Sequence, residues 1–262
     1  MRKVEHYSAG QFKPLLVQKT WKRSLLTCHC LIIYEEDKII LLDCGLHCDA
    51  VNQFFMGARI SKNQTMKAHL DSQGISTHQV TDILITHLHP DHCGALSDFP
   101  NARIHLHEKE WRWVHDEPTH YKVKTHFTPS AWTHLKNPIL YSEMSVHWNG
   151  FSASPLQGLS SDLLLIYLPG HTPGHCGYLI PHGDEIIFHA GDAFYILEDL
   201  EPNIENKNFT SAMTQAGVSY NLKEQQKTLK KIQSLLKKNI PGLRLINSHD
   251  EKLFPSDQTL AK

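Results

Sequence analysis

Apolar residues gather in short runs along this chain, and polar turns separate the runs. Residues 24–34 and 38–43 are two such runs, and the polar segment 35–37 between them predicts a β-hairpin. Further runs predict the following strands: 83–86, 103–107, 163–168, 176–180, 185–189 and 243–248. Strands are therefore expected along most of the chain.

Helical patterns fall between these runs. Residues 61–73 are compatible with a helix, and Gly74 follows as a helix-ending residue. A second helix is expected over 108–114. Near the end, Asn221 followed by Glu224 has the spacing of an N-cap and its partner. The apolar stripe expected for that last helix comprises Leu222, Leu229, Ile232, Leu235 and Leu236.

The middle of the chain follows neither pattern. Residues 116–158 carry prolines and four histidines but no regular period, so we predict an insertion or lid there. The tryptophans of this region and its flank either line a pocket or pack in the core: Trp111, Trp113, Trp132 and Trp148. Because there is no internal repeat, low-complexity run or linker, residues 1–262 are expected to form a single domain.

Composition narrows the class of protein. The formal net charge is −1 over 262 residues, which gives no basic surface for nucleic acid. No apolar run is long enough to span a membrane, and the first residues do not resemble a signal peptide. We therefore expect a cytoplasmic protein with its six cysteines as free thiols. The sequence specifies no oligomeric state.

The most informative segment follows the strand expected at 83–86. His87, His89, Asp91 and His92 place three imidazoles and a carboxylate within six positions. His87 and His89 alternate as on an extended chain, so both can point to one ion. Pro90 favours a bend, which can direct Asp91 and His92 to a second ion. This pattern predicts a metal site at the end of a strand.

The spacing His-x-His-x-Asp-His resembles the signature of the metallo-β-lactamase fold superfamily. Later segments fit the same family: His171 in a Pro-Gly-His-Thr-Pro-Gly-His loop, Asp192 after His189-Ala190-Gly191, and His249 after a strand. The strand end at Asp43 is also similar. The resemblance implies an α/β fold, a four-layer αββα sandwich with the metal site at one edge.

By the same resemblance, the ligands would hold two divalent metal ions. The first ion would have His87, His89 and His171, and the second Asp91, His92 and His249, with Asp192 bridging. Imidazoles and carboxylates without a thiolate suit Zn²⁺ above all, and also iron, manganese or cobalt. Two such ions about 3.5–4 Å apart can share a hydroxide, a nucleophile at neutral pH.

Tyr195 lies three residues after Asp192, as in the N-acyl-homoserine lactonases, where a tyrosine contacts the lactone carbonyl. This resemblance implies a small-molecule lactone or ester substrate, opened by the bridging hydroxide. Tyr195 would stabilise the oxyanion, and Asp91 would pass a proton to the leaving alkoxide. Asp43 would orient a ligand, or else be a simple turn residue.

Other chemistries use related sites. A glyoxalase II-like thioester hydrolase shares the ligand types but has a helical region after its last ligand, whereas 13 residues follow His249 here. Ester and phosphodiester hydrolysis also suit two metals. β-Lactam hydrolysis is disfavoured, because Asp192 stands where lactam-hydrolysing members commonly have cysteine at a metal-two position. A non-catalytic metal-binding member would typically have lost ligands, and none is lost here.

Overall fold

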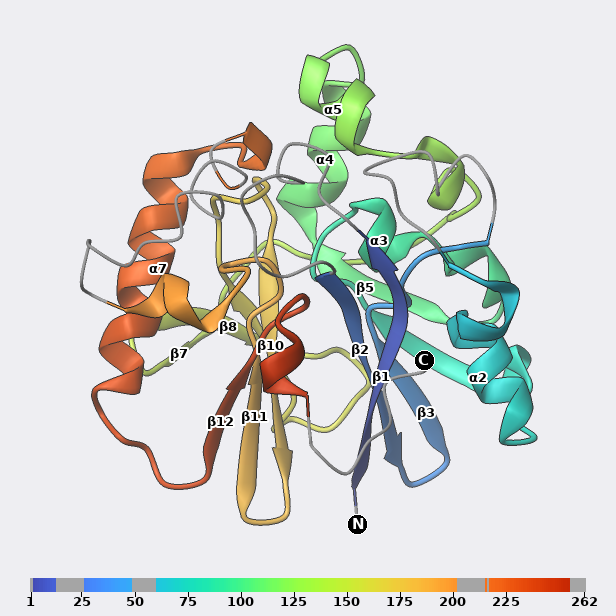
Figure 1. Ribbon diagram of the computed structural model, residues 1–262, viewed down its shortest axis with the longest axis horizontal. Helices are drawn as coiled ribbons and strands as arrows, with labels where there is room; N and C mark the ends of the chain where they lie inside the picture. Colours follow the sequence, from blue (N-terminus) through green and yellow to red (C-terminus); the bar gives the residue numbers. More distant parts are fainter. Residues whose placement is uncertain (1, 13–25, 49–59, 202–214, 216, 255–262) are drawn as a thin grey trace.

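Two β-sheets lie face to face between outer helices in the computed structural model, which describes residues 2–12, 26–48, 60–201, 215 and 217–254 (Figure 1). Within these residues the first sheet has six strands in chain order. They are β1 (Lys3–Phe12), β2 (Leu26–Glu35), β3 (Lys38–Leu42), β4 (Val80–Leu84), β5 (Arg103–His107) and β6 (Ile139–Tyr141).

The second sheet runs from β12 to β7 in reverse chain order and also has six strands among the described residues. They are β7 (Val146–Trp148), β8 (Phe151–Pro155), β9 (Leu164–Tyr167), β10 (Cys176–His182), β11 (Glu185–His189) and β12 (Leu243–Ile246). The helices are α2 (Met66–Ser72), α3 (Pro90–Cys93), α4 (Glu108–Asp116), α5 (Tyr121–His126) and α7 (Leu222–Leu236).

Alternating side chains build separate cores on the two faces of each sheet. In β2, Leu31 and Ile33 pack between the sheets, whereas Cys30 and Ile32 pack toward the outer helices. In β10, Tyr178 and Ile180 face the space between the sheets, and Leu179 points the other way. This period of two is what a strand buried on both faces requires.

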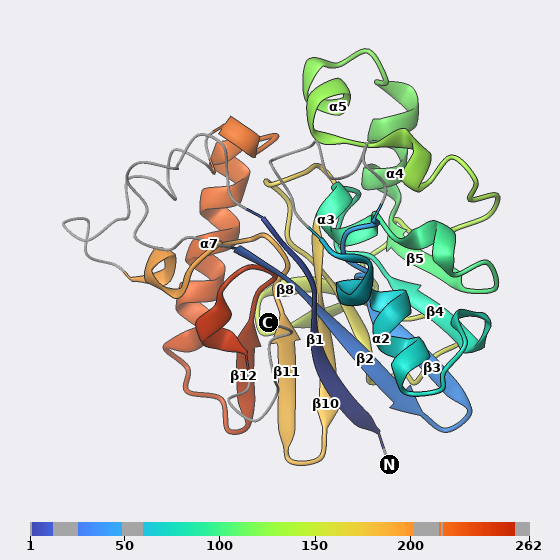
Figure 2. The same ribbon diagram turned by 45° about the vertical axis from the view of Figure 1, so that its right-hand side comes forward.

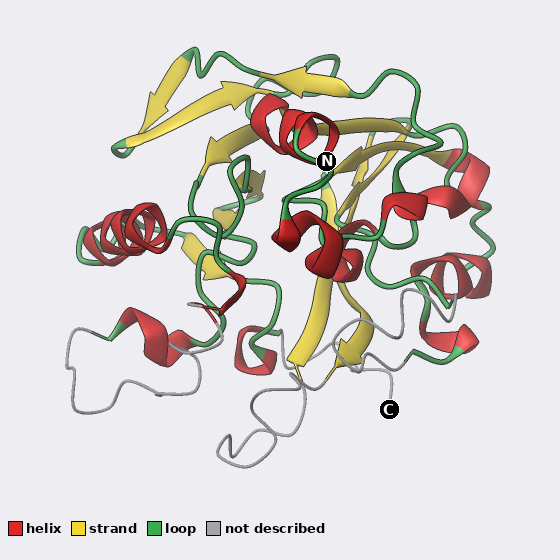
Figure 3. Cartoon of the chain, turned by 90° about the horizontal axis from the view of Figure 1, so that it is seen from above, coloured by secondary structure: helices red, strands yellow, loops and turns green. Residues whose placement is uncertain are grey.

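The outer cores place the helices. Met66 of α2 and Trp113 of α4 pack on the first sheet, and Ile232 and Leu235 of α7 pack on the second. Figure 2 shows α7 on one side of the strands and α2 on the other, and Figure 3 shows the helices around the strands from above. The four-layer αββα sandwich predicted from the sequence is confirmed.

Strand direction brings several strand ends to the same edge. The hairpin of β2 and β3 is antiparallel, as predicted, but β3, β4, β5 and β6 run parallel, and β12 runs parallel to β11. The carboxyl ends of neighbouring parallel strands lie together. Residues that follow β3 and β4 can therefore meet, as can residues that follow β11 and β12.

Some local predictions need correction. The helix expected over 61–73 is α-helical only from Met66, after a 3₁₀ turn at Lys62–Gln64, and Gly74 follows with a φ of +75°. The stripe expected for α7 is wrong at both ends, since Leu222 and Leu236 are 40% and 37% exposed. Gln225 and Thr228 lie on the buried face instead.

The segment 116–158 contains regular elements that its sequence did not reveal. Strands β6, β7 and β8 all fall within it and belong to the two sheets. Only the part before β6, which includes α5, stands at the end of the molecule near α3 and α4 (Figure 1). Trp113 and Trp132 are buried in the core outside the first sheet, and Trp148 packs beyond the second sheet, so core packing is confirmed for these three.

No helix in the part of the chain that the structure describes is both long and apolar enough to cross a membrane.

Candidate metal centre

The seven residues predicted as ligands follow strand ends and meet at one edge of the sandwich. His87 and His89 come after β4, and Asp91 and His92 lie in α3, which begins at Pro90. The remaining three follow later strands: His171 after β9, Asp192 after β11 and His249 after β12. All seven are at most 4% exposed, so their polar atoms need partners inside the protein.

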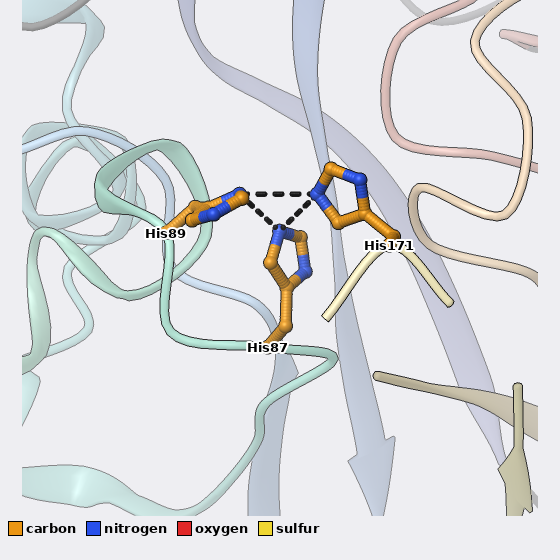
Figure 4. A group of neighbouring side chains, drawn as sticks. All are labelled: His87, His89 and His171. Carbon is orange, nitrogen blue, oxygen red and sulfur yellow. Dashed lines mark hydrogen bonds between the residues drawn. The ribbon is translucent and has the colours of Figure 1, made fainter. Parts of the chain in front are cut away.

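Three imidazole nitrogens converge in the first cluster (Figure 4). Nε2 of His87 lies 2.9 Å from Nδ1 of His89, and Nε2 of His171 lies 3.1 Å and 3.0 Å from these two atoms. A tetrahedral ion with bonds of about 2.0–2.1 Å places its ligand nitrogens about 3.4 Å apart. The spacing of this first triad matches that arrangement within a few tenths of an ångström.

A second triad is formed by Asp91, His92 and His249. Oδ2 of Asp91 lies 3.4 Å from Nε2 of His92 and 3.7 Å from Nε2 of His249. The carboxylate of Asp192 stands between the triads. Its Oδ2 is 3.4 Å from His171 and 3.0 Å from His249, while its Oδ1 is 3.3 Å from His92. Asp192 therefore contacts both triads, as its predicted bridging position requires.

The electrostatics of the first triad favour neutral imidazoles. Burial, and then the neighbouring histidines, hold the pKa of His87 and His89 well below the ordinary value. Burial also lowers the pKa of His171 to about 3. A neutral imidazole has a lone pair on one nitrogen, and three such lone pairs facing each other suit a cation.

The second triad combines carboxylates with histidines. Burial lowers the pKa of His92, but Asp192, Asp91 and Asp43 outweigh burial and raise this pKa well above its usual range. In the described part of the chain, the ion pairs of Asp91 and Asp192 are all with histidines. The carboxylates of Asp91 and Asp192 therefore give the second triad a negative charge that favours a bound cation.

Among the residues that the structure describes, several buried polar atoms at the centre have no hydrogen-bond partner. They include Oδ1 of Asp91, Nε2 of His92 and Oδ1 of Asp192. Leaving such atoms unsatisfied is costly, and a coordinated ion would satisfy them. Together with a donor set of imidazoles and carboxylates, this fits a divalent metal ion.

Further contacts fix the orientation of these side chains. Nδ1 of His92 donates to Oδ2 of Asp43, and Thr86 donates to both Asp43 oxygens through its amide and hydroxyl. Nδ1 of His249 donates to the Thr27 carbonyl. Asp43 thus contacts a member of the second triad, so it is more than a turn residue. Outer hydrogen bonds of this kind typically hold metal-binding histidines in place.

His175 contacts the main chain of Asp192. Its Nδ1 donates to the carbonyl of Leu168, and its Nε2 accepts the main-chain N–H of Asp192. The groups of clustered ligand atoms among the described residues do not include His175, so this histidine contacts Asp192 without belonging to either triad.

Tyr195 lies beside both triads. The centroid of its ring lies 6.1 Å from the ring centroid of His171 and 5.3 Å from that of His249, and both ring pairs are edge-on. Phe127, which follows α5, lies against the first triad, with its ring 4.6 Å from that of His89. The centre is therefore bordered by Tyr195, which carries a hydroxyl, and by the apolar ring of Phe127.

The sequence analysis missed Glu110 of α4, a carboxylate with no exposed surface. It accepts hydrogen bonds from the loops on which His87, His89 and His171 lie. Burial raises the pKa of Glu110 to about 7. A signal was available, because Glu110 precedes Trp113 and Val114 by three and four residues and so shares their buried helix face.

The layered fold and the buried histidine–aspartate centre define a metal-binding α/β sandwich. The chain belongs to the metallo-β-lactamase superfamily, whose family model matches residues 23–240. It is a metal-dependent hydrolase of that superfamily. Among curated proteins it is similar to a "probable metallo-hydrolase" of Mycobacterium bovis and to one of Mycobacterium tuberculosis. Each is 26% identical over 96% of this chain and 81% of the relative.

Solved structures share the fold at low identity. A quorum-quenching N-acyl homoserine lactone lactonase superposes with a TM-score of 0.72 at 18% identity, covering 99% of this chain and 96% of that one. An N-acyl homoserine lactone hydrolase with N-hexanoyl-L-homoserine at its catalytic metal centre also gives 0.72, at 19% identity with 99% and 98% coverage. A dizinc quorum-quenching lactonase gives 0.66 at 18% identity, with 95% and 88% coverage.

Proposed function

We propose that this chain opens the ring of a small lactone, of the N-acyl-homoserine lactone type, with two divalent metal ions, preferably Zn²⁺. The first ion would be held by His87, His89 and His171 and the second by Asp91, His92 and His249, and Asp192 would serve both. The observation that carries the proposal is the place of Tyr195, whose ring contacts one histidine of each triad. A substrate carbonyl lying over the centre would be within reach of its hydroxyl.

When bound, the metal ions would supply Lewis-acid activation of water and of the carbonyl under attack. The hydroxyl of Tyr195 donates a hydrogen bond to the carbonyl oxygen as negative charge develops there. Asp91 takes up the proton that the attacking water loses and passes it to the alkoxide released when the ring opens. Asp43 keeps His92 oriented throughout.

We also propose that the single domain carries a lid formed by the part of 116–158 that precedes β6. The contact of Phe127 with His89 supports this, because it places an apolar ring beside the metal ligands. Such a wall excludes water from one side of the centre and strengthens electrostatic interactions within it. An apolar surface there also suits a substrate with an acyl chain.

The structural relatives support the choice of substrate class. One of them holds a hydrolysed homoserine product at its metal centre, and another is a dizinc lactonase. Asp192 in place of a cysteine disfavours β-lactams. A thioester or a phosphodiester could use the same two metal ions, so these substrates are the comparison that matters.

The test is a hydrolysis screen of the purified, metal-loaded protein. It compares N-acyl-homoserine lactones of several chain lengths, simple γ- and δ-lactones, S-lactoylglutathione and a bis-aryl phosphodiester. We expect kcat/KM for at least one lactone to exceed the values for the thioester and the phosphodiester by tenfold or more, on the order of 1.4 kcal/mol in transition-state binding. Turnover confined to S-lactoylglutathione or the phosphodiester would reject the lactonase proposal and leave a metal-dependent hydrolase of another substrate.

A further inference from the structure

Glu110 joins the two loops that supply the first triad. Its Oε1 accepts the N–H of Leu88, the residue between His87 and His89, at 3.0 Å. Its Oε2 accepts the hydroxyl of Thr172, next to His171, at 2.5 Å and the N–H of Gly174 at 3.1 Å. One buried carboxylate is thus bonded to both loops, although these lie more than eighty residues apart in the chain.

Close packing reinforces this connection. A Cβ added to Gly174 would come within 2.1 Å of the backbone nitrogen of Glu110, so the loop rests directly on the backbone of α4. On its other side, a Cβ at Gly170 would come within 2.2 Å of the backbone nitrogen of Gln225 in α7. The loop that carries His171 is therefore held between two helices, and Glu110 is a buried polar connection on the α4 side.

The second triad has different supports. His92 is held by Asp43 and His249 by the Thr27 carbonyl, and neither contact involves Glu110. Glu110 therefore does not bond to the groups that orient His92 and His249, although the Thr86 hydroxyl lies within 3.3 Å of a ring nitrogen of both His87 and His92. A change at Glu110 acts directly on the loops that carry His87, His89 and His171. It reaches the second triad indirectly, through Asp192, through Thr86 and along the chain from His89 to His92.

We propose that Glu110 is a positioning residue that sets the separation of His171 from His87 and His89, and with it the metal affinity of the first triad. The inference rests on the proposed assignment of the two triads to metal ions, and it is independent of the substrate. The two oxygens of the carboxylate together accept three hydrogen bonds. A side chain that carries an N–H or O–H donor in place of one oxygen cannot accept all three.

The test is Glu110→Gln, which keeps the size of the side chain but turns one acceptor oxygen into an NH₂ group. That group then faces a donor, either the Leu88 amide or the pair at Thr172 and Gly174, and the two loops lose a connection. We expect the affinity of one metal site to fall by about 10–100-fold, as when outer-shell partners of metal ligands are removed, and the other to change much less.

The measurement is a titration of metal-free protein with Zn²⁺ in competition with a chromophoric chelator, which resolves two binding steps. Asp82→Asn is the matched control. Asp82 is also a fully buried carboxylate, but it bonds His105 and Arg103 and neither of the loops. We expect it to lower the thermal midpoint of the metal-free protein while leaving both affinities unchanged.

Thr172→Val provides a second, milder test, since it removes one donor to Glu110 and leaves the carboxylate in place. It should weaken the same binding step by a smaller factor, and it keeps the test valid if Glu110→Gln fails to fold. Unchanged affinities in Thr172→Val and Glu110→Gln, or an equal loss at both sites, would overturn the proposal. The parent protein's own titration reports separately whether two ions bind, and the substrate screen reports whether lactones are hydrolysed.

Discussion

The carboxylate of Asp43 lies 2.8 Å from Nδ1 of His92, and the chain holds Asp43 in a left-handed conformation to place it there, with a φ of +54°. This conformation is uncommon for residues other than glycine, although aspartate and asparagine tolerate it best. The same carboxylate accepts two hydrogen bonds from Thr86, the residue before His87. Backbone strain at this turn thus coincides with a contact that orients the second triad.

Asp43→Asn should therefore weaken metal binding while preserving the fold. Asparagine adopts the same backbone conformation and can still accept from Thr86, but its NH₂ group cannot accept the N–H of His92. We expect a loss of about 10–100-fold in affinity at the second triad, measured by the competition titration. Equal affinities in the variant and the parent would show that Asp43 is structural only.

Metal content tests the centre as a whole. Protein purified without chelators and dialysed against Zn²⁺ should contain two metal ions per chain by elemental analysis. Removing them should abolish hydrolysis and lower the thermal midpoint, because ligands that bind only the folded state stabilise it. Restoring Zn²⁺ should reverse both changes. A content that stays near zero after supplementation would contradict the proposed binuclear centre.

Asp192 should be the most sensitive single residue. Its two oxygens contact histidines of both triads, so Asp192→Ala should weaken both binding steps and reduce turnover at least about 100-fold, beyond the range of outer-shell changes. The main-chain bond from Asp192 to His175 remains in this variant and supports the fold. A variant that binds two ions and turns over normally would show that Asp192 does not bridge.

The start of α7 offers a stability test away from the chemistry. The Asn221 side chain accepts the main-chain N–H groups of Lys223 and Glu224, as an N-cap does. Asn221→Ala should cost about 1 kcal/mol, or about 2–4 °C in the thermal midpoint. Lys227→Ala removes only an exposed ion pair with Glu224 and should cost less than about 0.5 kcal/mol. A loss no larger in Asn221→Ala than in this control would contradict the cap assignment.

Features that depend only on neighbouring residues in the chain could be predicted from the sequence. His87, His89, Asp91 and His92 form a compact motif after a strand, and Asn221 stands where a helix must begin, so both were evident before the fold. The later members of the cluster, His171, Asp192 and His249, were found through the family resemblance. The structure brings their side chains together.

Features that depend on tertiary contacts were not predictable in this way. Gln225 and Thr228 are buried in α7 although they are polar, because tertiary hydrogen bonds satisfy them. Gln225 accepts from Ser219 and donates to the Asp192 carbonyl, and Thr228 donates to the Pro169 carbonyl. Glu110 likewise has a role only once two distant loops meet it. Strand β6 has three residues, too few to show any alternation.

The lactone assignment depends most on Tyr195. Tyr195→Phe removes one hydroxyl and leaves the ring contacts with His171 and His249 in place, so metal content and fold should be retained. Turnover of a lactone should fall by up to ~10²-fold, as for the loss of a single oxyanion donor.

Because this hydrogen bond strengthens as charge develops on the carbonyl oxygen, the loss should appear mainly in kcat, with KM changed less. If a metal ion contacts the same oxygen, the decrease could shrink to roughly tenfold, since one of two stabilising contacts survives. The measurement is steady-state kinetics on the best lactone of the screen, with metal content determined on the same sample. Parental kcat and KM in Tyr195→Phe would make Tyr195 a packing residue, and the centre would then carry no feature that favours lactones over other substrates of a binuclear hydrolase.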